Sequence, residues 1–166
     1  MDIIQEQPQT ADSNDSEKKE SVLDTTQFDI VKAVQHGILD RVRQLVDNGN
    51  VDVKQPDSEN VTLLHWAAIN NRPEVVNFLL QRGADINAIG GDLHSTPIQW
   101  ATRQGVLAMV VQLLQHGADP LIPDSEGQSC IHLAAQIGHT AIAAYLIAKG
   151  TNVDHQDRNG MTPLAW

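Results

Sequence analysis

The sequence predicts an all-α solenoid in which a unit of two helices repeats about every 33 residues. Three independent markers predict this fold. Threonine or serine opens four similar segments, at Thr62, Thr96, Ser129 and Thr162, with spacings of 34, 33 and 33 residues. The other markers keep the same period: a glycine at Gly49, Gly83, Gly117 and Gly150, and an alanine at Ala33, Ala67, Ala101 and Ala134. Three markers in phase over four units indicate a true repeat.

The first 27 residues differ in composition from the rest of the chain. They contain seven acidic and two basic residues, no aromatic residue and only a few scattered aliphatic ones. Such a segment cannot bury enough apolar surface to offset the entropy that it would lose on ordering. Residues 1–27 are therefore predicted to form a disordered acidic tail, and the repeats begin at Phe28.

Each unit is predicted to contain a helix, a turn, a second helix and a loop. The opening threonine or serine can cap a helix N-terminus, and Pro97 or Pro163 just after it suits the first helical turn. Nine positions after each opening stands a residue that tolerates the left-handed conformation ending a helix: Gly37, Asn71, Gly105 and Gly138. A second apolar helix follows, as in 75–80, and Gly83 marks its end.

These markers resemble ankyrin repeats, whose signature is Thr-Pro-Leu-His followed by alanine on a period of 33. The units then run at about 28–56, 57–90, 91–123 and 124–156, with a fifth at 157–166. The first unit lacks the Thr-Pro-Leu-His opening and is expected to act as an N-terminal cap. Because the fifth unit stops inside its first helix, the chain is expected to be an N-terminal fragment of something longer.

Charge and composition argue against several classes of protein. The chain has 11 Lys and Arg residues against 21 Asp and Glu, a net charge of −10, which disfavours nucleic acid or an anionic membrane as a partner. The longest apolar run, 141–148, is far shorter than the roughly 20 residues of a membrane-spanning helix. The N-terminus lacks the features of a secretory signal. One cysteine cannot build a disulfide framework, which indicates a reduced, cytosol-facing protein.

The residues that could carry chemistry all have structural explanations. His65 and His132 occupy one repeat position two units apart, so roughly 20 Å separates them, too far for one metal ion. We expect them to tie the loops of neighbouring repeats together. Cys130 and His132 are two positions apart and do not face each other on a helix. Gly90-Gly91 lacks the further glycines of a phosphate-binding loop and is expected to form a tight turn. The sequence thus predicts no catalytic residue, cofactor or metal site.

Tryptophan is more informative. Trp66, Trp100 and Trp166 all lie four residues after the opening of their unit, where Leu133 stands in unit four. A large rigid ring with one N–H donor is favoured at peptide-binding sites. The alternative is that each ring fills space between helices, and both interpretations stay open at this point.

Several strings go beyond the general ankyrin pattern. They include Leu-Leu-His-Trp-Ala-Ala-Ile-Asn-Asn-Arg at 63–72, Gly-Gly-Asp-Leu-His-Ser-Thr-Pro at 90–97 and Trp-Ala-Thr-Arg-Gln-Gly at 100–105. With these strings, residues 28–166 closely resemble the ankyrin domain of the huntingtin-interacting DHHC palmitoyltransferases. In that family the repeats lie on the cytosolic side, ahead of transmembrane helices and a cysteine-rich catalytic domain. The enzymes S-acylate proteins at Golgi and vesicle membranes.

The resemblance implies that this chain recruits substrate proteins to a protein S-palmitoyltransferase. The family's ankyrin groove captures a short extended segment rich in Val, Ile, Gln and Pro, and the Asn and Trp that it uses match Asn70 and Trp100 here. The implied partners are synaptic-vesicle, SNARE-associated and huntingtin-like proteins. Gln99 and His94 stand where the family tends to have His and Asn.

The 166 residues contain no Asp-His-His-Cys string, so the chain itself is expected not to be an enzyme. Palmitoyl-CoA and zinc would belong to a separate catalytic domain. The alternative function is a free-standing ankyrin adaptor or competitor in the cytoplasm, which binds the same clients without acylating them.

Overall fold

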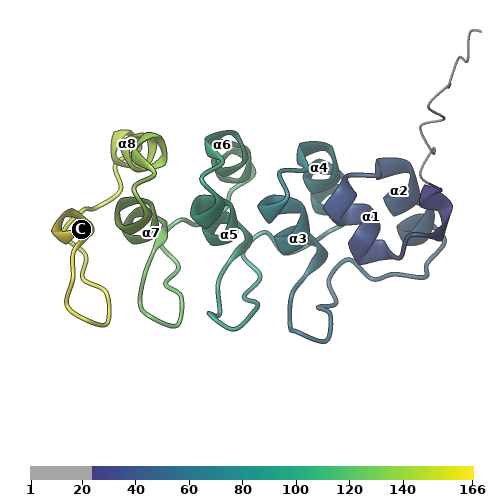
Figure 1. Ribbon diagram of the computed structural model, residues 1–166, viewed down its shortest axis with the longest axis horizontal. Helices are drawn as coiled ribbons and strands as arrows, with labels where there is room; N and C mark the ends of the chain where they lie inside the picture. The colour runs from purple at the N-terminus through teal and green to yellow at the C-terminus, as the bar shows by residue number, and fades with distance from the viewer. Residues whose placement is uncertain (1–23) are drawn as a thin grey trace, which may run out of the picture.

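The computed structural model describes residues 24–166 and shows a row of helix pairs (Figure 1). The helical elements are, in chain order, η1 (Thr25–Gln27), α1 (Ile30–His36), α2 (Leu39–Asp47), α3 (Leu63–Ile69), α4 (Pro73–Gln81), α5 (Pro97–Gln104), α6 (Leu107–Gln115), α7 (Cys130–Ile137), α8 (Thr140–Ala148) and η2 (Pro163–Ala165). The all-α repeat fold expected from the sequence is confirmed. The disordered tail predicted for residues 1–27 lies outside the described residues up to residue 23, and η1 occupies its last three positions.

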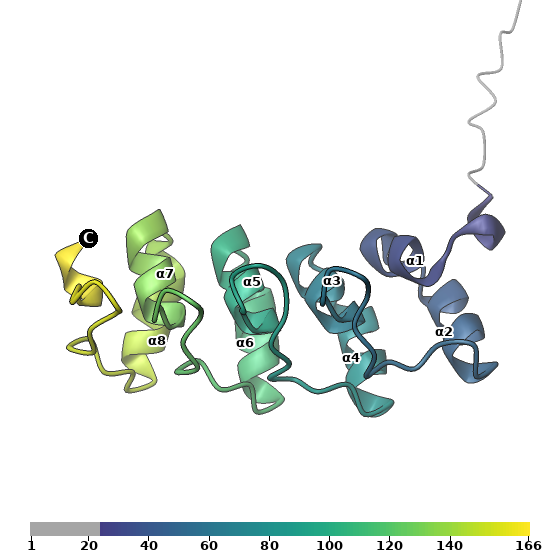
Figure 2. The same cartoon turned by 90° about the horizontal axis from the view of Figure 1, so that it is seen from below.

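The helices form two layers. Figure 1 shows α3, α5 and α7 in one row, with α4, α6 and α8 above them and the hairpin loops projecting below. The view from below, in Figure 2, shows the same succession of pairs along the molecule. The inner helices pack on one another, since α3 lies against α1 and α5, and α5 lies against α7. Each unit contacts its immediate neighbours, which is the geometry of a solenoid.

The helix ends follow the residues that the sequence pattern singles out. The hydroxyl oxygens of Thr62 and Thr96 accept a hydrogen bond from the backbone N–H three positions on, which caps α3 and α5. Pro97 occupies the first turn of α5. The residues that follow the inner helices, Gly37, Asn71, Gly105 and Gly138, have φ angles of 69°, 52°, 79° and 88°. The predicted left-handed turns are therefore confirmed in all four units.

The core is a continuous apolar layer between the two rows of helices. Leu64, Leu79, Ile98 and Leu113 are among its fully buried side chains. The inner helices contribute small residues, and Ala67, Ala101 and Ala134 are completely buried. A larger side chain at these three positions would push neighbouring units apart, because protein interiors have little free space.

One repeat position ties each unit to the loop of the next. It holds His65 in α3, Gln99 in α5 and His132 in α7, all fully buried. Each side chain bonds back to the residue that opens its own helix. Each also reaches backbone carbonyls farther along the chain at 2.7–2.9 Å: Ser95 for His65, Ile122 and Gln128 for Gln99, and His155 for His132. The structural role expected for the two histidines is confirmed, and Gln99 performs it in unit three.

The last described unit ends in η2 instead of a full helix. Its final residue, Trp166, is 52% exposed. Across residues 24–166, no helix combines the length and the apolarity that crossing a lipid bilayer requires.

Candidate functional site

A cavity of about 280 Å³ lies where the hairpin of unit three meets the inner helices α3 and α5. Its lining residues are Ile69, Gly91, Asp92, Leu93, Trp100 and Arg103. Leu93, at the tip of the hairpin, leaves 42% of its surface exposed beside the indole. An exposed apolar side chain beside a half-buried aromatic ring is a suitable surface for a ligand with aliphatic groups.

Trp100 forms one wall of this cavity and is held in place by other rings. Its ring centroid lies 5.0 Å from that of His65, at an interplanar angle of 64°, and 5.7 Å from that of Trp66, at 90°. Both are edge-to-face contacts, which aromatic pairs prefer. The hairpin covers another edge, because Gly91 lies so close that a Cβ atom there would be 3.0 Å from Cζ2 of Trp100. The ring is therefore fixed before any ligand arrives.

Asn70 ends helix α3, one residue after Ile69, and is half-buried. Its Nδ2 donates a hydrogen bond of 2.8 Å to the carbonyl oxygen of Trp66, which holds the amide group at the end of the helix. Asn70 lies beside the cavity and does not line it. The structure thus places Trp100 in the cavity wall and Asn70 next to it, and their joint role in peptide binding stays a prediction.

Trp66 has a different environment from Trp100. Its Nε1 donates a hydrogen bond of 3.0 Å to Oδ2 of Asp57. Burial raises the pKa of the Asp57 carboxyl, but the hydrogen bonds from Trp66 and from the backbone outweigh that effect and leave the pKa below its usual value. Asp57 is therefore ionised at neutral pH and fixes the Trp66 ring, whose edge in turn contacts Trp100.

Among the lining residues, the sequence interpretation singled out Trp100 as a site residue and missed Ile69, Asp92, Leu93 and Arg103. Arg103 is the charged residue among these that makes an ion pair. It lies one helical turn after Trp100 on the same face of α5, a spacing that could have indicated it. Its guanidinium donates to Oγ of Ser95 at 2.8 Å and to Oδ2 of Asp124 at 2.6 Å. The Asp124 side chain is fully buried, so this ion pair is shielded from water and links α5 to the loop of unit four.

The remaining candidates offer no reactive group. Cys130 is completely buried, and burial raises the pKa of its thiol to about 12, so the thiolate is scarcely populated at neutral pH. Among residues 24–166, no three His, Cys, Asp or Glu side chains come together as metal ligands would. Gly90 and Gly91 form part of the hairpin, where Gly90 and Ser95 exchange two backbone hydrogen bonds.

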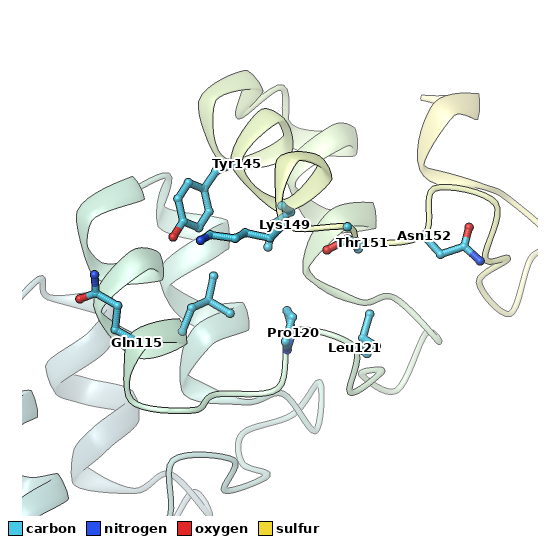
Figure 3. A pocket seen from close by; sticks show the side chains of 10 residues that line it. Gln115, Pro120, Leu121, Tyr145, Lys149, Thr151 and Asn152 are labelled. Carbon is cyan, nitrogen blue, oxygen red and sulfur yellow. The ribbon is translucent and has the colours of Figure 1, made fainter.

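A larger cavity, of about 520 Å³, lies between the ends of the outer helices α6 and α8. Figure 3 shows Tyr145 and Lys149 reaching from α8 toward Gln115 at the end of α6, with Pro120 and Leu121 below them. Neither of the two site residues predicted from the sequence, Asn70 and Trp100, lies in its wall.

The same repeat is found in a known protein family. A model described as ankyrin repeats (3 copies) matches residues 11–90 and 98–166, most of the chain. The chain belongs to the ankyrin-repeat family. The helix pairs and projecting hairpins described above are the units of that repeat.

The ankyrin repeats are similar to those of named palmitoyltransferases. The chain is 58% identical over 149 residues to "Palmitoyltransferase ZDHHC17" of Danio rerio, which is 90% of this chain and 24% of that protein. It is 55% identical over 141 residues to "Putative palmitoyltransferase ZDHHC13" of Danio rerio, 85% of this chain and 22% of the relative. With "Palmitoyltransferase ZDHHC17" of Homo sapiens it shares 62% identity over 114 residues, 69% and 18% of the two chains. The resemblance read from the sequence is confirmed, and the chain spans about a quarter or less of the length of these relatives.

Proposed function

We propose that this ankyrin module recruits substrate proteins to a protein S-palmitoyltransferase by binding a short extended segment of the Val/Ile-Gln-Pro type. One observation carries the proposal: Trp100 forms a wall of an apolar cavity beside Asn70, in a chain 58% identical over 149 residues to a named palmitoyltransferase. Ankyrin repeats bind other proteins, and a half-buried aromatic ring beside a polar amide suits an extended peptide.

The chemistry of the two side chains supports this mode of binding. The fixed indole of Trp100 offers a flat face on which a proline ring or an aliphatic side chain can pack. One N–H of the Asn70 amide donates to the carbonyl oxygen of Trp66, which leaves the other N–H and Oδ1 able to bond to a peptide backbone. Ile69 and Leu93 add apolar contacts on either side.

The proposed role is binding, with acyl transfer carried out elsewhere. The thiol of Cys130 is buried with a raised pKa and is a poor acyl acceptor in the folded chain. On this proposal the module faces the cytosol at Golgi and vesicle membranes, and palmitoyl-CoA and zinc are used by a separate catalytic domain. Its partners are proteins with the linear motif, such as synaptic-vesicle, SNARE-associated and huntingtin-like clients.

Binding of a short capped peptide that contains Val, Ile and a Gln-Pro step tests the proposal. Isothermal titration should show that Trp100→Ala lowers the affinity at least about thirtyfold, the loss expected of a binding hot spot. Asn70→Ala should lower it about three- to tenfold, because it removes hydrogen bonds of ordinary strength.

The matched control is Trp166→Ala, which removes the same ring from an exposed position in another unit. It should bind the peptide as the parent chain does. Far-UV circular dichroism should show that all three variants keep their helices. Native affinity in both Trp100→Ala and Asn70→Ala would show that the peptide binds elsewhere.

A further inference from the structure

One repeat position places a basic residue at the end of each outer helix. Arg82, His116 and Lys149 each stand one residue before the repeated glycine, and each is the C-cap of its helix. A positive charge at this position offsets the partial negative charge of the helix end. The three side chains therefore start from equivalent places, and they differ in what the preceding unit sets opposite them.

In unit two the basic side chain is paired within the fold. Nη1 of Arg82 lies 2.9 Å from Oδ1 of Asp47, at the end of α2 in the preceding unit. Cζ of the same guanidinium lies 4.9 Å from the centroid of the Phe78 ring. A cation at this helix end thus takes a carboxylate from the preceding unit, next to an aromatic ring.

Unit four repeats the cation and the aromatic ring without the carboxylate. Nζ of Lys149 lies 5.6 Å from the centroid of the Tyr145 ring, which stands where Phe78 stands in unit two. The position of Asp47 is held by Gln115, whose amide group carries no charge. Within the part of the chain that the structure describes, no carboxylate forms an ion pair with Lys149. The ammonium group is therefore free to meet an anion from outside the chain.

The cavity of about 520 Å³ between α6 and α8 adjoins this ammonium group, and both Lys149 and Gln115 line it. Figure 3 shows the lysine side chain running along Tyr145 toward α6. Most of the remaining wall is aliphatic, from Leu114, Pro120, Leu121 and Leu146. Leu121 is 57% exposed, so the fold itself leaves this wall open to solvent. A complementary ligand has aliphatic groups for the wall and a carboxylate for the cation.

We infer that this cavity docks a segment of a partner protein in which an aspartate or glutamate stands next to leucine-like residues. Its carboxylate takes the place opposite Lys149 that Asp47 takes opposite Arg82. A cavity of this volume has room for more than one side chain. The site lies at the outer helices, whereas the Trp100 cavity lies at the inner helices and a hairpin, so the inference does not depend on the proposed function.

Titration of the ¹⁵N-labelled 166-residue chain with a capped Leu-Asp-Leu peptide, followed by NMR, tests the inference. The backbone N–H resonances of Leu121, Gly150 and Thr151 should shift. A capped Leu-Asn-Leu peptide should bind up to about fivefold more weakly, the range of a partly exposed ion pair. Raising NaCl from about 0.05 to about 0.5 M should weaken binding of the acidic peptide alone, because salt screens the charge.

Gln115→Asp is the sharpest variant, because it restores the carboxylate of unit two without removing any part of the aliphatic wall. The new carboxylate should pair with Lys149 and lower the affinity for the acidic peptide at least about threefold. Lys149→Met should have the same effect, and Lys149→Arg should retain binding. The matched control is Gln81→Asp, which makes the same change at the equivalent position one unit earlier and should leave the affinity within about twofold.

Equal binding of the acidic and neutral peptides would overturn the inference, as would native affinity in both Gln115→Asp and Lys149→Met. Competition between the acidic peptide and the Val/Ile-Gln-Pro peptide would also overturn it, since the two would then share the Trp100 cavity. Gln115→Asp should bind the Val/Ile-Gln-Pro peptide as the parent chain does. The failure of this inference and the failure of the proposed function are therefore distinguishable.

Discussion

His65 connects folding to the candidate site at the scale of a single residue. Its imidazole is completely buried, bonds to Thr62 and to the Ser95 carbonyl, and lies edge-on to Trp100. Burial lowers its pKa below the usual value of 6.5, although the hydrogen bond to Ser95 and the charge of Asp57 oppose the shift. The neutral ring is therefore the form that the fold and the Trp100 wall require.

The depressed pKa of His65 predicts a stability that depends on pH. The contribution of the buried His65 ring to the free energy of unfolding is fully present above pH 6.5, because the ring is then neutral in both the folded and the unfolded chain. As the pH falls below 6.5, the unfolded chain takes up the proton first, so the free energy of unfolding should drop by up to about 1.4 kcal/mol per pH unit. Urea denaturation between pH 7 and about pH 5 would measure this slope.

The matched variant is His65→Gln, since Gln99 fills the equivalent position in unit three with hydrogen bonds of the same kind. Its stability should change less over this pH range than that of the parent chain. Three carboxyl groups also have lowered pKa values: Asp24, Asp57 and Asp157. Their effect on stability is lost only as the pH falls below about 4, outside the range of this experiment. An equal slope in both chains would assign the pH dependence to another group.

At the scale of helices and hairpins, the helix ends were predictable because they depend on local chemistry. A threonine cap, a proline in the first turn and a glycine with positive φ act within a few residues, and the repeat shows each of them several times. The site was harder to predict. The two aspartates do follow the repeat, since Asp57 and Asp124 both lie five residues before the opening of their unit. Their partners do not, because Asp57 bonds to Trp66 of its own unit and Asp124 pairs with Arg103 of the unit before.

Helix α5 carries Trp100, so its N-terminal cap should matter for the whole site. Thr96 accepts from the backbone N–H of Gln99, and the Gln99 side chain accepts from the N–H of Thr96 at 2.8 Å. Thr96→Ala should lower the free energy of unfolding by about 1 kcal/mol, the usual worth of such a cap. Chemical denaturation measures the change. Thr140→Ala is the control, because Thr140 begins α8 from an exposed position without capping it, and it should stay within about 0.5 kcal/mol of the parent. Equal losses in the two variants would mean that the reciprocal bonds at α5 add nothing.

At the scale of the whole molecule, stability passes from unit to unit through the stacked helices. Units two and three have neighbours on both sides, and α5 packs against α3, α6 and α7. A solenoid of this kind behaves as a chain of units coupled to their nearest neighbours. The candidate cavity lies between α3 and α5, so it depends on the contact between two units remaining closed.

Ile98→Ala should therefore disturb more than its own unit. Ile98 is completely buried in α5, and removal of such a side chain costs about 2–5 kcal/mol. Because α5 couples α3 to α7, weakening unit three should let the C-terminal units unfold before the N-terminal ones. The single unfolding transition should then become two. Hydrogen exchange followed by mass spectrometry would show this as loss of protection in α7 and α8 while α1 and α3 stay protected. Ile147→Ala is the control, since Ile147 is 48% exposed on α8 and its loss should cost much less. A uniform loss of protection along the chain in Ile98→Ala would show instead that the units unfold as one cooperative body.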